Sequence, residues 1–210
     1  MATYEVKVTI PKKWVETFNE NGTKLCFSHG VKDSGSGLNF NVVGTAVVAA
    51  ENVKLTWTDV YWIAGGRQSF SAGTKIDATT NPEKIKFHQM VKLDKAFVLE
   101  PPVQDDKVED GQFSFNNEPI ASAYLYKSVA QEDGGKEETL PFYISQGGPN
   151  PPGRSIFTPK PVTRIYFAKH VETGTMIEDY QTVPIDIDLT GKTKAEVAYD
   201  ADGNWKEKEA

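Results

Sequence analysis

The sequence LTWTDVYWIAGG, residues 55–66, is typical of a β-strand. Every second position from Val53 to Ile63 is apolar, with the exception of Asp59. A period of two places these positions on one face of a strand, so the stretch predicts a core face that contains an acid. An ionised carboxylate is costly in an apolar layer unless it is paired. We therefore expect either a bulge near Thr58 that turns Asp59 outward, or a polar cavity in which a donor meets its carboxylate.

The same alternation recurs along the chain and predicts an all-β protein. Turns rich in Gly, Asn, Asp and Pro separate the alternating runs, and helical patterns are limited to short stretches at 11–18 and 193–196. We expect about a dozen strands in an antiparallel β-sandwich or flattened barrel, forming a single domain over residues 1–210. A parallel α/β fold is not expected because no helical segment of crossover length lies between the strands. The alternating runs are residues 4–10, 113–115, 120–124, 139–145, 162–168 and 185–189.

The charge balance disfavours nucleic acids and membranes as partners. The chain has 23 basic and 29 acidic residues, which give a net charge of −6. No basic excess is present to displace counterions from a phosphate backbone or to attract an anionic bilayer. Aromatic residues make up 11% of the chain, and the large area that each ring buries compensates for a modest apolar content of 39%.

We expect a cytoplasmic protein. The start of the sequence, MATYEVKVTIP, reads as a strand and lacks the apolar segment of a signal peptide. No apolar run approaches the roughly 20 residues of a membrane span. Cys26 is the one cysteine, which excludes an internal disulfide and suits a reducing compartment. Asn21-Gly22-Thr23 matches a glycosylation motif, but without a secretion signal it predicts a turn.

The sequence offers no catalytic or metal-binding constellation. His29, His88 and His170 are far apart and lack the close spacing of zinc ligands. Cys26 lies in an alternating apolar run, which predicts a buried, unreactive thiol. The acidic stretch at 105–110 misses the spacing of a calcium loop. Phosphate-binding, dinucleotide-binding and nucleophile-elbow motifs are also missing, so we expect a protein that is not an enzyme and has no metal site.

Two interpretations fit the rings of residues 57–70. The first is ordinary packing in the core or against the sheet. In the second, Trp62 forms a shelf for a planar ligand, Gly65 and Gly66 let the backbone approach the ligand, and Arg67 stacks on it or donates a hydrogen bond. The candidate ligand-binding residues, drawn from this stretch and from rings and an arginine elsewhere, are Trp57, Asp59, Tyr61, Trp62, Arg67, Phe70, Tyr124, Arg154 and Phe157.

Residues 146–161 are the most linker-like part of the chain, because they are rich in proline and glycine. Proline lacks the N–H group that a regular strand or helix requires, so this segment predicts irregular structure. We expect either a plain surface loop or a lid over a binding site.

A family resemblance follows from a signature in the opening stretch. Residues 57–65 read WTDVYWIAG and match the pattern Trp-Thr-x-x-Tyr-x-Ile-x-Gly, and Phe70, Gly73, Ile76 and Thr80-Asn81 continue it. Over residues 43–90 the chain resembles a group of small fungal cytosolic β-proteins that includes mushroom chromoproteins. The resemblance implies a non-enzymatic pigment protein that holds a small, coloured, indole-derived ligand, such as an indolone, without metal chemistry. It implies no individual ligand contact.

The residues also leave a second function open, that of a sugar-binding or membrane-active defence protein of the lectin or cytolysin kind. In that case an exposed ring of Trp14 or Trp62 stacks on a sugar or lies at a lipid interface. The many predicted strands leave edges to cover, and assembly into a homo-oligomer is one way to cover them.

Overall fold

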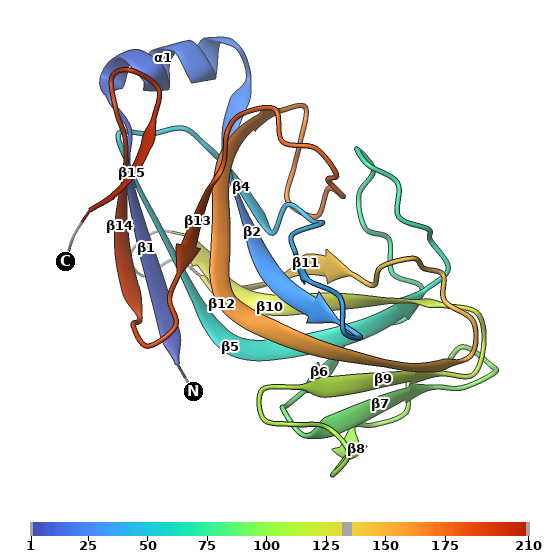
Figure 1. The fold of residues 1–210 in the computed structure, drawn as a ribbon. Coiled ribbons are helices and arrows are strands. Elements are labelled where there is room, and N and C mark those ends of the chain that lie inside the picture. The colour runs from blue at the N-terminus through green and yellow to red at the C-terminus, as the bar shows by residue number, and fades with distance from the viewer. Residues whose placement is uncertain (1, 132–135, 209–210) are drawn as a thin grey trace.

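The computed structural model describes residues 2–131 and 136–208, and most of these residues lie in strands. Two sheets pack against each other, and neither closes into a barrel (Figure 1). The prediction of an all-β protein is confirmed, and the architecture is the sandwich rather than the flattened barrel. With seven strands in one sheet and eight in the other, the described residues form somewhat more strands than predicted.

The first sheet contains the opening stretch at its centre. Its hydrogen-bonded order is β11-β10-β5-β1-β14-β15, and β6 pairs with β5 beside this path. The strands are β1 (Thr3–Thr9), β5 (Asn52–Gly66), β6 (Glu83–Ile85), β10 (Ser122–Gln131), β11 (Glu138–Ile144), β14 (Lys194–Tyr199) and β15 (Trp205–Lys208).

The second sheet is built around the long strand β12. Its order is β3-β2-β12-β9-β7-β8, while β13 pairs with β12 and β4 pairs with β2. The strands are β2 (Thr23–Asp33), β3 (Leu38–Asn39), β4 (Thr45–Val48), β7 (Gln89–Leu93), β8 (Val103–Gln104), β9 (Phe113–Asn117), β12 (Gly153–Lys169) and β13 (Ile185–Asp188).

Most strand pairs are antiparallel as predicted, but two of the pairs between the described strands are parallel, so both sheets are mixed. β1 pairs in parallel with β14, and β7 pairs in parallel with β9. Parallel pairing requires a connection of a dozen or more residues, which both pairs have. Almost the whole chain separates β1 from β14, and residues 94–112 separate β7 from β9. The alternation of single strands gives no information about such long-range pairing.

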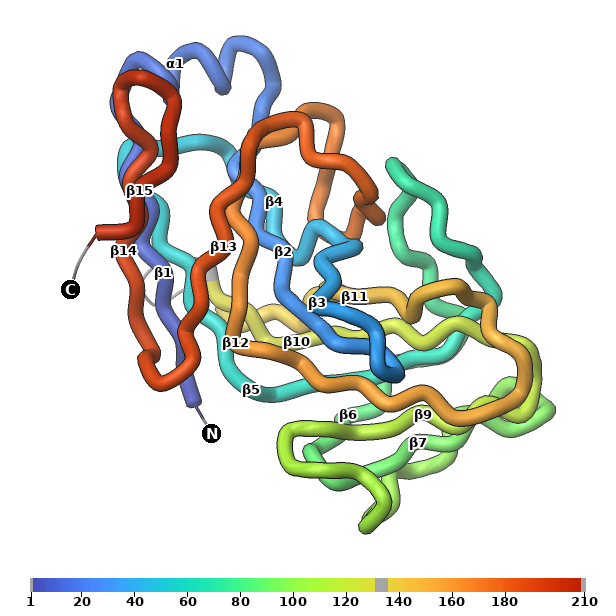
Figure 2. The backbone as a smooth tube through the Cα atoms, in the orientation of Figure 1, coloured from blue at the N-terminus to red at the C-terminus, as the bar shows by residue number. Residues whose placement is uncertain are grey.

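The helical prediction for residues 11–18 is confirmed by α1 (Lys12–Glu20). Pro11 precedes the helix, where its missing N–H group breaks no helical hydrogen bond. Phe18 stacks on Phe167 with a distance of 4.1 Å between ring centroids, and Trp14 packs edge-on against Tyr199. The helix therefore covers one end of the core, together with β15 (Figure 2).

Two other local predictions are wrong. Residues 193–196 do not form a helical turn, because Ala195 and Val197 alternate into the core as part of β14. Residues 146–161 were expected to be a loop or a lid, but β12 begins at position 153. From there on, the segment is part of a strand. β12 accommodates its prolines because its register with β2 shifts between Pro159 and Thr163, so the missing N–H groups fall where the ladder is interrupted.

Candidate functional site

An outer hollow of about 640 Å³ opens beside β3 and β12. This volume lies within the range of roughly 300–1,000 Å³ that is typical of small-molecule sites. Five segments that are far apart in the sequence meet here, and three of them, at residues 70, 146–148 and 177–180, are connections between strands. The lining residues are Leu38, Asn39, Phe40, Asn41, Phe70, Gln146, Gly147, Gly148, Arg164, Ile177, Glu178 and Tyr180.

One wall of the outer hollow is a fixed stack of an arginine and two rings. The guanidinium of Arg164 lies over the ring of Phe40 at 4.2 Å and over the ring of Tyr180 at 4.9 Å. The two ring residues are also linked directly, because Tyr180 Oη donates a hydrogen bond of 2.7 Å to the Phe40 carbonyl. Arg164 donates to both carboxylate oxygens of Asp186, at 2.6 and 2.7 Å. These bonds raise the pKa of Arg164, so the wall carries a cation whose charge is already matched.

Another part of the outer hollow is anchored to both sheets. Asn41 Nδ2 donates to the Ile144 carbonyl at 2.7 Å, and Asn41 Oδ1 accepts from Ile144 N at 3.3 Å. Gln146 N donates to Asp33 at 2.9 Å. The carboxylate of Glu178 is exposed at the rim, where it is available as a hydrogen-bond acceptor. The hollow is thus a pre-formed space lined by both apolar and polar groups.

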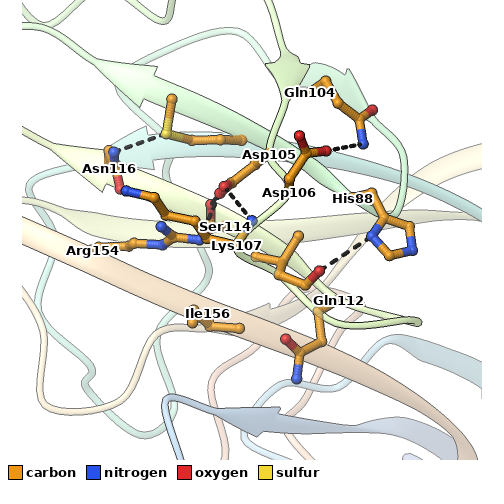
Figure 3. A network of polar contacts seen from close by, with 12 residues as sticks. His88, Gln104, Asp105, Asp106, Lys107, Gln112, Ser114, Asn116, Arg154 and Ile156 are labelled. Carbon is orange, nitrogen blue, oxygen red and sulfur yellow. Dashed lines mark hydrogen bonds and ion pairs between the residues drawn. The ribbon is translucent and has the colours of Figure 1, made fainter.

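The structure does not bring the nine predicted ligand-binding residues together. Phe70 lines the outer hollow. Arg154 lines a separate hollow of about 370 Å³, and its guanidinium pairs with Asp105 at 2.6 Å (Figure 3). Desolvation opposes ionisation of Asp105, but bonds from Ser114 Oγ and Lys107 N and the charge of Arg154 hold its pKa below the ordinary value. Arg154 therefore connects β12 to Asp105, which follows β8, and does not join the predicted rings.

Four of the predicted rings are packed inside the sandwich. Trp57, Tyr61, Tyr124 and Phe157 are all at most 4% exposed. They belong to three different core clusters, since Trp57 lies in one, Tyr61 and Phe157 in another and Tyr124 in a third. A single ring-lined slot made of all nine residues is therefore wrong, because packing of one sheet against the other fills the inner faces of these strands.

The shelf predicted at Trp62 is also not formed. The guanidinium of Arg67 stacks on Phe97 at 3.8 Å, while Lys84 lies over the Trp62 ring. The backbone at Gly66 is covered by the ring of Tyr124, since an added Cβ would lie 2.2 Å from that ring. The glycine therefore allows close approach of a neighbouring side chain, not of a ligand.

The bulge predicted in the opening stretch is present. The register of β5 with β10 shifts so that Lys127 lies opposite Tyr61 and Val129 lies opposite Trp57. Tyr4 Oη donates to Asp59 Oδ2 at 3.2 Å, and Tyr61 Oη donates to Asp59 Oδ1 at 3.0 Å. The strand is thus bulged as expected, and two phenols donate to the half-buried carboxylate of Asp59.

A second candidate site, the Lys127 chamber, lies next to this bulge and consists of His29, Trp57, Tyr61, Lys127 and Phe142. Lys127 is 2% exposed, and its ammonium lies 5.4, 5.7 and 4.9 Å from the ring centroids of Trp57, Tyr61 and Phe142. Burial lowers the pKa of Lys127 from 10.5 to about 7, and the nearby charge of Asp59 only partly opposes this.

His29 belongs to the same chamber. Its ring packs edge-on against Trp57, with centroids 4.8 Å apart, and against Phe142 at 6.1 Å. His29 is 1% exposed, and its Nε2 atom has no hydrogen-bond partner among the described residues. Burial, and to a smaller extent the charge of Lys127, hold the pKa of His29 well below its ordinary value. The chamber therefore combines a neutral imidazole with an amine that titrates near neutral pH.

Sequence reasoning missed both basic residues, although a signal for Lys127 was present. Ala123, Leu125 and Val129 share its strand parity, and all three are buried, so parity alone places Lys127 on the core face. The pairing of His29 with Lys127 depends on how the two sheets face each other, which the sequence does not reveal.

The remaining histidines and the cysteine are in separate places. His88 bonds to Asp110 at 2.7 Å, and the described residues contain no group of three or more His, Cys, Asp or Glu suited to a metal ion. Cys26 is buried as predicted, and burial raises its thiol pKa to about 12. Within residues 2–131 and 136–208, no helix has the length and apolar character needed to cross a bilayer.

No protein-family model, curated protein or solved structure matches the chain. The resemblance to the fungal β-proteins therefore stays a prediction, and the proposals below are argued from the two sites themselves.

Proposed function

We propose that the protein is a non-enzymatic binding protein that holds a small planar aromatic ligand in the outer hollow. The observation that carries this proposal is the hollow itself, with about 640 Å³ of space beside the rings of Phe40, Phe70 and Tyr180. Flat rings bind a flat guest by apolar burial and by stacking, and the fixed wall at Arg164 requires little rearrangement when the guest enters.

The charges of the hollow indicate what kind of planar ligand it takes. Arg164 is already matched by Asp186, so it provides little additional attraction for an anion. Glu178 at the rim is suited to accept a hydrogen bond from a ring N–H group. A neutral heteroaromatic ring with an N–H donor satisfies these conditions. An indole-derived pigment, which the family resemblance implies, belongs to this class, and no metal enters the proposal.

Native mass spectrometry combined with an absorption scan tests the proposal on the purified protein. We expect a bound molecule that absorbs in the visible or near-ultraviolet range and is released on denaturation. Phe70→Ala removes one ring of the hollow and should reduce the occupied fraction about tenfold, which corresponds to about 1.4 kcal/mol.

Phe97→Ala is the matched control, because Phe97 is a half-buried ring that packs under Arg67 and does not line the hollow. The control should retain the ligand. A colourless native preparation that releases no small molecule, or equal loss of ligand in both variants, would contradict the proposal.

The second function, a sugar-binding or membrane-active defence protein, stays a prediction with its own tests. The Trp14 ring packs against Phe18 and Tyr199, which leaves less of it available to a sugar or a lipid than the sequence suggested. Binding on a glycan array or leakage from liposomes would support this second function. No signal in either assay would favour the proposal of an aromatic ligand.

A further inference from the structure

The Lys127 chamber is unusual because an amine occupies a position that an apolar side chain would fill at lower cost. Transfer of a charged ammonium into a dry interior is strongly unfavourable unless the group is paired or becomes neutral. Lys127 meets three ring faces, and a purely structural role would be served at least as well by methionine, which has a similar shape. A lysine desolvated in this way is a recurrent arrangement for a nucleophilic amine.

The backbone is irregular on both sides of this residue. The register with β11 shifts between Leu125 and Tyr126, and the register with β5 shifts between Lys127 and Val129. Bulges interrupt the ladder, and they are over-represented next to active sites. Local opening of a sheet is easiest where its hydrogen bonds are already interrupted, so these bulges offer a small molecule a route to a side chain that is otherwise covered.

An unsatisfied polar atom lies at the same place. The Nε2 atom of His29 is buried and has no hydrogen-bond partner among the described residues. His29 contacts Trp57 and Phe142, two of the rings that surround the lysine. Buried polar atoms are normally bonded, so an unpartnered one beside an amine indicates that a guest or a reaction uses it.

We propose that Lys127 is a reactive amine that holds a small aromatic aldehyde or ketone as an imine, with His29 carrying the proton. The Lys127 chamber shares no residue with the lining of the outer hollow, so this inference is independent of the proposed function. The rings of Trp57, Tyr61 and Phe142 would flank the aromatic part of the carbonyl compound.

The reaction needs no oxidant or reductant. The lone pair of neutral Lys127 Nζ attacks the carbonyl carbon, and the electron pair of the C=O π bond moves to oxygen. His29 Nε2 takes a proton from the new ammonium centre and gives it to the oxygen, which forms a carbinolamine. The nitrogen lone pair then forms the C=N bond as the C–O bond breaks, and the remaining N–H proton passes through His29 to the departing oxygen, which leaves as water. One carbonyl compound and one amine thus give one imine and one water.

Trapping with benzaldehyde and sodium cyanoborohydride at pH 7 tests this proposal on the folded full-length chain. The reductant converts an imine into a stable benzyl-lysine, which intact-mass measurement counts and peptide mapping locates. We expect Lys127 to be labelled faster than the other lysines by on the order of tenfold or more, because an amine with a normal pKa is almost fully protonated at this pH.

Variants separate the reactive role from a structural one. Lys127→Met should abolish the fast labelling, while Lys13→Met, which removes an exposed lysine beside Trp14, should leave it unchanged. His29→Phe keeps a ring in the chamber and should slow the labelling of Lys127 roughly tenfold without exposing it to trypsin. Labelling of surface lysines alone, or labelling of Lys127 only after denaturation, would overturn the proposal.

Discussion

At the scale of the residue, burial determines what the side chains of both sites can do. Lys127 and Arg164 carry the same formal charge, but Arg164 keeps its proton because Asp186 matches it, whereas Lys127 loses its proton readily because rings surround it. The same principle explains why Asp59 is tolerated beside the core, since two phenols donate to it.

Lys127→Met should stabilise the protein at neutral pH. The folded-state pKa is lowered from 10.5 to about 7, which corresponds to a penalty of roughly 4–5 kcal/mol. This penalty is fully present below pH 7, where the lysine is charged in both states, and it disappears as the pH rises from about 7 to 10.5. Urea unfolding of the native protein and the variant across this range measures the difference, which should shrink steadily with pH. A difference that does not change with pH would contradict the burial argument.

At the scale of the element, β5 shows how much of a strand's structure can be predicted from its own sequence. Its alternation, the bulge near Thr58 and the acid at Asp59 were all predictable, because they follow from the period of a strand and the cost of a buried charge. The continuation of β12 through Pro159 was not predictable, because it depends on a register shift against β2. The partners of Trp57 and Tyr61 were likewise hidden, since sheet-to-sheet packing selects them.

The close approach of β5 and β10 gives a test at this scale. Gly66→Ala would place a Cβ atom 2.2 Å from the Tyr124 ring, so the ring must move and its bond from Gln68 N must weaken. We expect a loss of roughly 2–4 kcal/mol in the free energy of unfolding. Gly37→Ala is the control, because nothing lies within 4 Å of its added Cβ. Equal unfolding midpoints for the two variants in urea would show that the contact does not constrain the sheet.

At the scale of the whole molecule, the class of fold was accessible from the sequence and the location of the sites was not. Alternation and turns identify strands, but the parallel pair of β1 with β14 joins the two ends of the chain. The outer hollow likewise forms where residues 38–41, 146–148 and 177–180 meet, and of the nine predicted ligand-binding residues only Phe70 lines it. Connections of this kind carry no periodic pattern, so their convergence becomes visible only in the fold.

The most direct measurement of the central claim is an amide chemical-shift titration of the protein with indole. Binding in the outer hollow should shift the amide signals of residues 38–41, 146–148 and 177–180 in a saturable manner, and Phe70→Ala should weaken the dissociation constant about tenfold. Signals of α1 and β15 should stay unchanged, because these elements do not line the hollow. Saturable shifts centred on other residues, or no saturable shift at all, would contradict the account.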